Sequence, residues 1–529
     1  MENKSNNFNK KDIFVASIDI GTNSTHLLIA QVNAELKSFN IKFTEKSTTR
    51  LGERDEDGNL TEESINRVLE TLKRFKEYCF SYGVERILAA ATSAVRESPN
   101  GKSFINKIKD EVGFQVELIS GAEEARLIYL GVLSGMDLEN RSHIILDIGG
   151  GSTELILANS EDTRALTSAR VGAVRLKNDF LDGEPLNTSR IEFLKTFIMG
   201  SLEPSVGKIK KRIKKNEPIS MVATSGTAIS LGNLISSGLG EPKQKMHGYK
   251  YTQDDIDSTL QKLFCLSSSE RRKIQSLSER RSEIIIPGGL ILKTCMEMLD
   301  INELTISERA LREGLVVDWM IRKGMLKSKF GIQSNIRKTT VMHQADKFAV
   351  DKLKSEKVAK IALQIYDQTY NILHRDQNKR GRNLLWAACF LYNSGKQINL
   401  TAYHKHSWYL IKNCELLGYS LVEKNIIAAI ARYHRKTLPK KRHESWQNLI
   451  SREDKAIALD MSLILRLAAA INKRPDPVVS SVKIKLSDNE ISFQLISSDP
   501  GTNLILEKWS LESCNEVIKE LKNLVLKVV

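Results

Sequence analysis

The sequence Asp19-Ile20-Gly21-Thr22-Asn23-Ser24-Thr25 lies near the amino terminus, and Asp147-Ile148-Gly149-Gly150-Gly151-Ser152-Thr153 repeats its D-I-G-x-x-S-T pattern later in the chain. Each copy follows an apolar run typical of a strand, and each precedes another apolar run, at residues 26–32 and 154–158. Each copy is therefore expected to be a turn between two strands, unlike a Walker loop, which opens a helix. The repeat predicts a duplicated half-domain.

The composition of these turns favours phosphate binding. Gly, Ser and Thr let successive backbone N–H groups point into one hollow, and the missing Cβ of glycine lets phosphate approach. Asp19 and Asp147 lead the two turns, where a carboxylate could hold a hydrated metal ion. A single turn of this kind is about as well explained as a plain hairpin. Two matching turns favour a phosphate site.

Two further segments leave predicted strands. Residues 223–228 (ATSGTA) include Gly226 and Thr227 and precede a helical stretch, whose amino terminus is a favourable place for an anion. Residues 91–97 (ATSAVRE) offer hydroxyl groups and Arg96. Taken alone, Arg96 is better explained as half of a surface salt bridge.

A base that could activate water is present in residues 119–126 (ISGAEEAR). Ser120 and Glu123 have the spacing of a capping box, so Glu123 is expected to cap a helix. Glu124 points about 100° away around that helix and can face a cleft instead.

The chain has 529 residues, and the spacing of its apolar residues changes along the sequence, which indicates several domains. From residue 12 to about 321, strand-like runs (13–20, 87–91, 144–148, 219–223) alternate with amphipathic helical stretches (61–82, 121–133), an α/β pattern. Residues 322–335 are polar and glycine-interrupted, and 336–473 read almost entirely as helices. Beyond residue 477 come two short strands, 482–486 and 491–495, and a final helix from Ser510.

Composition and charge narrow the class of protein. Apolar residues make up 41% and charged residues 27%, and no run approaches the length of a bilayer span. The first eleven residues are polar and lack the features of a secretory signal, which favours the cytoplasm. The six cysteines lie far apart, so they are expected to be buried, reduced thiols.

The net charge is +15, from 79 Lys and Arg against 64 Asp and Glu, so the protein should attract polyanions. Basic residues gather in runs at residues 208–215, 379–382 and 435–443. Each run is most simply a solvated face, and together they could instead line one groove.

Several motifs, in this order, resemble the exopolyphosphatase and guanosine-pentaphosphatase (Ppx/GppA) family of the actin-like superfamily. They are DIGTNSTHLLIA from Asp19, ATSAVRE from Ala91, ISGAEEARLIYLGV from Ile119, DIGGGSTEL from Asp147, ATSGTA from Ala223 and SERALREGLVVDWM from Ser307. The resemblance implies actin-like (ribonuclease H-like) half-domains at 12–138 and 139–330 and an all-α HD-like domain at 336–475. The polar start is expected to be a disordered tail (1–11), and the alternating runs near the end predict a small α+β region at 476–529.

The resemblance also implies roles for single residues. Glu124 matches the proposed catalytic glutamate, and Asp147 and Glu154 match the metal-handling and water-handling carboxylates, with Asp19 as a further metal ligand. The expected phosphate contacts are Asp19, Gly21, Thr22, Asn23, Ser24, Arg96, Gly149, Gly150, Gly151, Ser152, Thr153, Gly226 and Thr227. The implied cofactor is Mg²⁺.

The helical region departs from the HD pattern that it resembles. HD hydrolases bind metal through a His-Asp pair with further His and Asp ligands, but the expected pair is replaced by Tyr392 and Asn393. Ala469 and Asn472 stand where acidic residues would be expected, although His404, His406 and His434 remain. The domain is therefore expected to bind and position substrate or partners without a second metal-dependent active site.

The favoured function is processive hydrolysis of terminal phosphate from inorganic polyphosphate. Guanosine pentaphosphate is the alternative substrate, because both occur within the family. A sugar kinase or other actin-like ATPase, and a catalytically weak sensor of polyphosphate or alarmone, are rival hypotheses from other classes. A homodimer is expected, with no membrane or nucleic-acid partner.

Overall fold

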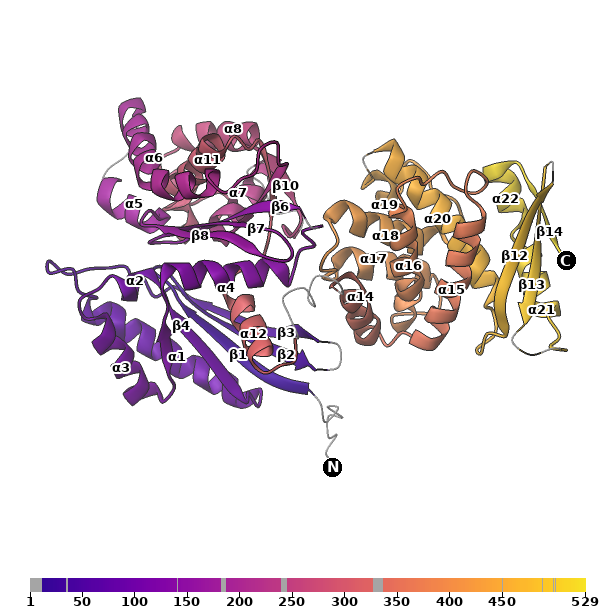
Figure 1. Cartoon of the computed structure of the whole chain (residues 1–529), viewed down its shortest axis with the longest axis horizontal. Helices are drawn as coiled ribbons and strands as arrows, with labels where there is room; N and C mark the ends of the chain where they lie inside the picture. Colours follow the sequence, from indigo (N-terminus) through magenta and orange to yellow (C-terminus); the bar gives the residue numbers. More distant parts are fainter. Residues whose placement is uncertain are drawn as a thin grey trace. The chain divides into compact units, whose positions relative to one another are not determined.

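A computed structural model describes residues 12–34, 37–139, 141–181, 187–238, 245–326, 336–449, 451–487, 489–497, 499 and 501–529. The tail expected at 1–11 lies outside the described residues. The chain divides into two compact units, Met1–Ile336 and Arg337–Val529, both drawn in Figure 1.

The first unit begins with a sheet ordered β3-β2-β1-β4-β5. Its strands are β1 (Asp12–Ile20), β2 (Thr25–Asn33), β3 (Ser38–Ser47), β4 (Arg86–Ala91) and β5 (Val116–Leu118). The first three strands are antiparallel neighbours, whereas β4 and β5 run parallel to β1. One face packs on α1 (Glu62–Ser81) and α3 (Gly101–Val112), because alternate residues of β1 such as Ile18 and Ile20 share a core with them.

A second sheet repeats this plan, in the order β10-β11-β9-β6-β7-β8. Its strands are β6 (Ser142–Ile148), β7 (Thr153–Ala158), β8 (Thr163–Ala169), β9 (Ile219–Thr224), β10 (Lys250–Thr252) and β11 (Glu303–Ile306). Strands β8-β7-β6-β9-β11 match β3-β2-β1-β4-β5 in order and direction. The predicted duplication is confirmed.

Helices α4 (Gly121–Leu133) and α12 (Leu311–Arg322) lie between the two sheets (Figure 1). They share one hydrophobic core with residues of both sheets, including Val15 of β1 and Ile145 of β6. The outer face of the second sheet is covered by α6 (Thr188–Lys210), α7 (Ser225–Ser237), α8 (Gln253–Phe264) and α11 (Ile285–Leu299). Short helices α2 (Ser93–Arg96), α5 (Ala173–Phe180), α9 (Ser268–Arg271) and α10 (Glu279–Ser282) complete the unit.

The second unit is helical over most of its length. Its helices are α14 (Ile336–Lys347), α15 (Lys352–Gln368), α16 (Arg380–Leu391), η1 (Ser394–Gln397), α17 (Tyr403–Asn413), α18 (Leu421–Tyr433), α19 (Glu444–Gln447) and α20 (Arg452–Ile471). A sheet of β12 (Val479–Ser487), β13 (Glu490–Ser497) and β14 (Val525–Val528) follows, with α21 (Ile505–Glu512) and α22 (Asn515–Lys522). Helices and sheet share one hydrophobic core.

Two local predictions are wrong. The single helix expected from Ser510 is instead α21, α22 and β14, because Asn523 adopts a left-handed conformation (φ 54°) that ends α22 and β14 then pairs with β13. Cys265, which follows the last turn of α8, is exposed, whereas the other five cysteines are buried and all six are free thiols.

No helix in the described part of the chain is long and apolar enough to cross a membrane.

Candidate active site

The two D-I-G-x-x-S-T turns have the same internal structure. Gly21 N donates to Ser24 O at 3.1 Å, and Gly149 N donates to Ser152 O at 2.9 Å. A Cβ at Gly21 or Gly149 would lie 3.0 Å from the serine oxygen of its own turn. Glycine at these positions is therefore required by the close approach of the backbone, and both turns connect antiparallel strands as predicted.

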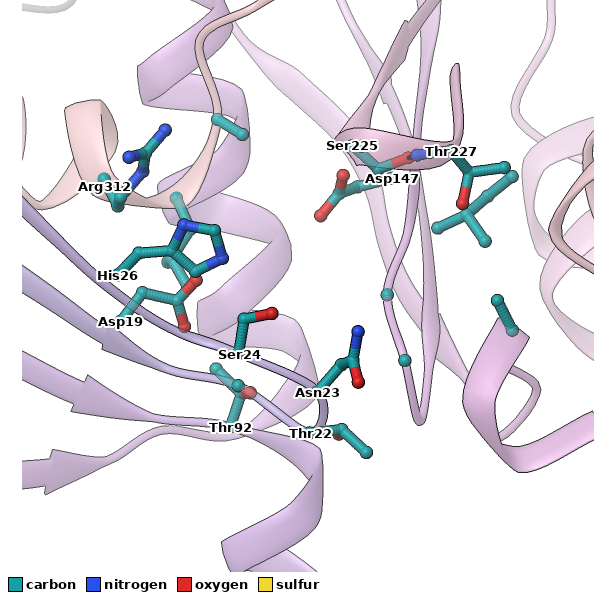
Figure 2. A pocket seen from close by; sticks show the side chains of 18 of the residues that line it. Asp19, Thr22, Asn23, Ser24, His26, Thr92, Asp147, Ser225, Thr227 and Arg312 are labelled. Carbon is teal, nitrogen blue, oxygen red and sulfur yellow. Dashed lines mark hydrogen bonds between the residues drawn. The ribbon is translucent and has the colours of Figure 1, made fainter. Parts of the chain in front are cut away.

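The two turns approach each other. A Cβ at Gly150 would lie 3.0 Å from Thr22 Cβ, and one at Gly151 would lie 2.9 Å from Thr22 Oγ1 and 2.6 Å from Ser93 Oγ. Figure 2 shows Thr22, Asn23 and Ser24 of the first turn beside Thr92, with Asp147 on the facing side. The duplicated turns thus form opposite sides of one cleft.

The third glycine segment lies at the junction of β9 and α7. Ser225 has a positive φ of 86°, which is uncommon for a residue with a side chain and often marks a functional site. Its Oγ accepts from Thr227 N at 3.2 Å. A Cβ at Gly226 would lie 1.7 Å from Arg281 Nη2, so only glycine leaves room for that guanidinium.

Glu124 lies in the first turn of α4, which begins as predicted after the N-cap Ser120. The residue is 7% exposed, and its Oε2 accepts from Arg96 Nη1 at 3.1 Å. Burial raises the pKa of Glu124 to about 7, while the Arg96 cation opposes the rise because it favours the ionised carboxylate. A carboxylate with this pKa is suited to accept a proton near neutral pH.

Glu123 does not complete the predicted capping box. Ser120 Oγ accepts from Glu123 N, but the Glu123 carboxylate pairs with both arms of Arg126, at 2.8 and 2.7 Å. Arg126 Nη2 also donates to Asp318 Oδ1 of α12 at 2.7 Å. The bidentate pair one turn along the helix competes for the carboxylate, so Glu123 instead helps to hold Arg126, which joins α4 to α12.

Three further carboxyl groups line or underlie the cleft. Asp147 lies opposite Glu154 in the β6–β7 ladder and accepts from Thr224 Oγ1. Burial raises the pKa of Asp147, and burial raises that of Asp19 to about 7. Glu154 is fully buried, accepts from Ser168 Oγ at 2.8 Å, and has a pKa well above its ordinary value because of burial and the charges of Glu124 and Asp147.

The cleft has a volume of about 430 Å³. The sequence-predicted residues that line it are Asp19, Gly21, Thr22, Asn23, Ser24, Glu124, Asp147, Gly149, Gly150, Ser152, Gly226 and Thr227. Arg96, Gly151, Thr153 and Glu154 are not among its described lining residues. Arg96 contacts the lining residue Glu124 instead of the cleft itself. The Thr153 hydroxyl group points elsewhere, because its Oγ1 donates to Val171 O at 2.6 Å.

Four basic lining residues were not predicted: His26, Lys46, Arg281 and Arg312. His26 lies opposite Asp19 in the β1–β2 ladder, the position that Glu154 has opposite Asp147. Figure 2 shows His26, Asp19 and Arg312 together on one side of the cleft. Burial, followed by nearby cations, lowers the pKa of Lys46 to about 8, and the cleft is therefore poised to receive an anion.

The donor set suits a hydrated Mg²⁺ ion. The buried Asp19 Oδ1 has no hydrogen-bond partner among the residues that the structure describes, and Asp147 faces it from the second turn. No group of three His, Cys, Asp or Glu side chains that could hold a metal occurs among the described residues. Mg²⁺ needs no such group, because it keeps several waters and commonly binds one or two carboxylates plus substrate phosphates. Metal binding by Asp19, Asp147 and Glu154 stays a prediction.

The duplicated sheets and the paired Asp-Gly turns across a cleft define an actin-like α/β protein. The chain belongs to the Ppx/GppA phosphatase family, whose model matches residues 28–323, and the model of domain III of that family matches residues 336–515. The family and its named members identify the chain as a phosphoanhydride hydrolase.

Individual relatives carry different names. A guanosine-5'-triphosphate,3'-diphosphate pyrophosphatase from Pseudoalteromonas atlantica is 28% identical over 487 residues, 91% of each chain. An exopolyphosphatase structure from Cytophaga hutchinsonii is 28% identical, covers 59% of this chain and 98% of its own, and has a TM-score of 0.53. The Ppx/GppA family member of Aquifex aeolicus is 29% identical over 59% of this chain and 99% of its own, with a TM-score of 0.50.

Proposed function

We propose that the protein is an exopolyphosphatase that processively hydrolyses terminal phosphate from inorganic polyphosphate. The observation that carries this choice is the cleft lining. It combines hydroxyl groups, backbone N–H groups and four basic side chains, and no Phe, Tyr or Trp is among the described lining residues. The lining is thus suited to consecutive phosphates and offers no aromatic side chain of those three types on which a purine could stack.

Glu124 is the general base in this mechanism. Its ionised carboxylate accepts a proton from a water molecule whose oxygen attacks the terminal phosphorus, and the bridging oxygen leaves with the shortened chain. Arg96 orients Glu124 through the 3.1 Å contact. The turns at Gly21 and Gly149 hold the phosphate oxygens in place, so that positioning and electrostatic stabilisation supply most of the catalysis.

Asp19 and Asp147, with Glu154 behind them, would hold Mg²⁺. The metal would supply positive charge against the phosphate oxygens. Burial raises the pKa of all three carboxyl groups, and neighbouring carboxylates add to the rise for Asp19 and Glu154.

Guanosine pentaphosphate is the second candidate substrate. The printed name of the relative from Pseudoalteromonas atlantica supports it. The apolar side chains of Ile148, Ile229, Ile284 and Leu311 also line the cleft and could contact a base.

Phosphate release from long polyphosphate, triphosphate and guanosine pentaphosphate, measured side by side, tests the choice. We expect the largest kcat/KM for long polyphosphate, and Glu124→Gln should lower the rate of release from all three substrates by about 10² to 10⁴. A larger kcat/KM for guanosine pentaphosphate would reverse the assignment of substrate. ATP serves as a further control, because hydrolysis of ATP alone would favour an actin-like ATPase.

The helical part of the second unit is proposed to be an HD-like domain without its metal site. Tyr392, Asn393, His434, Ala469 and Asn472, which stand at or near the expected metal positions, line one cavity. Burial lowers the pKa of His434 to about 3, and its Nδ1 lies 2.6 Å from Ala431 O. The homodimer expected from the sequence stays a prediction, which light scattering of the purified protein would test.

A further inference from the structure

A cavity of about 410 Å³ lies in the second unit, between α16, α18, α20 and α21. Six of its lining residues carry a positive charge: Lys354, Lys396, Arg435, Lys436, Arg466 and Lys473. No Asp or Glu is among the described lining residues. None of the six forms an ion pair with a carboxylate in the described part of the chain.

Several of these cations are held in place. The Lys396 ammonium lies 5.2 Å and the Arg435 guanidinium 4.7 Å from the centre of the Tyr403 ring. Arg466 donates to His434 O at 3.1 Å and to Lys436 O at 2.9 Å, so it fixes the segment after α18. These side chains are ordered around the cavity by neutral partners, and the nearby Asp351 offsets only part of the charge of Lys354 and Lys396.

The cations act on one another. Burial, followed by the charges of Lys354, Arg435 and Lys473, lowers the pKa of Lys396. Mutual repulsion of this kind costs stability, and a bound anion would remove the cost.

Uncharged polar groups complete the lining. Asn472 is 2% exposed, and its Nδ2 donates to Ala468 O at 2.8 Å. Its Oδ1 has no hydrogen-bond partner within the described part of the chain. Ser510 and Ser513 add hydroxyl groups. A buried carbonyl oxygen of this kind needs a donor, such as a hydroxyl group of a ligand or a ligand-bound water.

We propose that this cavity binds a compact ligand with two or more linked phosphate groups, at a site separate from the hydrolytic cleft. The volume is in the range of small-molecule sites. The shared chemistry is the oligophosphate group, which inorganic tripolyphosphate and a nucleoside 5'-triphosphate both carry. The proposal depends on the second unit alone and does not rest on the substrate of the first.

The test uses the full-length Glu124→Gln protein, so that the probes are not consumed. Calorimetric titrations with tripolyphosphate and with a nucleoside triphosphate should each show a binding event. The double variant Lys396→Gln with Arg435→Gln should weaken this binding by roughly a hundredfold, because each charge-assisted contact contributes about tenfold to the affinity. Lys483→Gln with Lys485→Gln, two exposed lysines of β12, removes the same charge and should leave the affinity unchanged.

A second measurement identifies the site directly. Acylation of Lys396, followed by mass spectrometry, should be suppressed by either probe and not suppressed by an equal concentration of chloride salt. Binding of both probes would show that the phosphate groups are recognised. Binding of the nucleotide alone would show that contacts to its nucleoside are needed as well. No protection of Lys396, or equal weakening in the β12 control, would overturn the proposal even if the first unit hydrolyses polyphosphate.

Discussion

Arg96 Nη1 lies 3.1 Å from Glu124 Oε2 and 2.9 Å from Ile119 O, so one guanidinium at the end of α2 is tied to the start of α4. Arg96 therefore holds the carboxylate of the proposed base in place and favours its ionised form against the effect of burial. Glu123, one residue away, has its own partner in Arg126. The adjacent glutamates thus have separable roles.

Replacing Glu124 with Gln should lower kcat by about 10² to 10⁴, the usual contribution of a positioned general base. Folding and polyanion binding should stay nearly unchanged. The matched variant, Glu123→Gln, breaks the pair with Arg126 and should mainly reduce thermal stability. Equal kinetic losses in both variants would remove the role assigned to Glu124.

Replacing Arg96 with Gln should shift the pH profile of kcat/KM. Arg96 opposes the rise in the pKa of Glu124, which lies at about 7. Without the cation the pKa rises further, so the ascending limb of the profile, where the base loses its proton, should move to higher pH. Arg175→Gln is the control, because Arg175 pairs with Glu97 at 2.6 Å and not with Glu124. An unmoved limb in Arg96→Gln would contradict the positioning role.

Replacing Glu154 with Gln should stabilise the fold at pH 8 while it lowers activity. The pKa of Glu154 in the folded state is raised well above its value of about 4.3 in the unfolded state. Between these two pKa values the folded state binds a proton that the unfolded state has released. The free energy of unfolding therefore falls as pH rises above about 4.3. Gln removes this cost, and the gain in Tm should be small at pH 4 and larger at pH 8.

Glu217 provides the control of opposite sign. Hydrogen bonds from Arg164 lower the pKa of Glu217 to about 2, so its contribution is present above the unfolded pKa and is lost as pH falls toward about 2. Glu217→Gln should therefore lower Tm at pH 8. Thermal unfolding of both variants at the two pH values checks the signs, and a Tm decrease in Glu154→Gln at pH 8 would contradict the argument.

Local patterns predicted the two glycine turns of the cleft and the start of α4, and twelve of the predicted residues line the cleft. The turns at Gly21 and Gly149 and the helix from Gly121 depend on contacts within a few residues, which glycine spacing and the Ser120 cap report directly. His26 and Lys46 could not be selected in this way, because only strand pairing brings them to the cleft. Arg312 was present in the SERALREG motif, but nothing local distinguished it from a surface arginine.

Competition between charged groups explains the missing capping box. Arg126, three residues along α4, takes the Glu123 carboxylate, and Asp318 of α12 accepts from the same arginine. Similarly, the run at 379–382 is partly structural: Arg380 pairs with Asp454 at 2.9 Å and Arg382 with Asp367 at 2.8 Å. Charge runs alone do not reveal such pairs.

Restoring a His-Asp pair with Tyr392→His and Asn393→Asp should not create metal-dependent phosphodiesterase activity. Ala469 and Asn472 would still lack carboxylates, and six cations around the same cavity would repel a divalent ion. Activity with a chromogenic phosphodiester in the presence of Mn²⁺ is the measurement. Metal-dependent turnover in the double variant, absent from the wild type, would show that the site had lost only those two ligands.

The last prediction concerns the exposed residues Lys440, Lys441 and Arg442, which form no ion pair among the described residues. If these cations bind the polyphosphate chain, affinity should fall with added salt more steeply for long chains than for short substrates. By analogy with nucleic acids, each phosphate that a cation neutralises releases counterions and contributes roughly one unit to the slope of log affinity against log salt concentration. Neutralising all three should raise KM and flatten the salt slope for long polyphosphate, while triphosphate hydrolysis barely changes. Lys483→Gln with Lys485→Gln is again the control for a general loss of charge. If neither quantity moves, these residues are a solvated loop, and the preference for polyphosphate over guanosine pentaphosphate would then rest on the cleft lining alone.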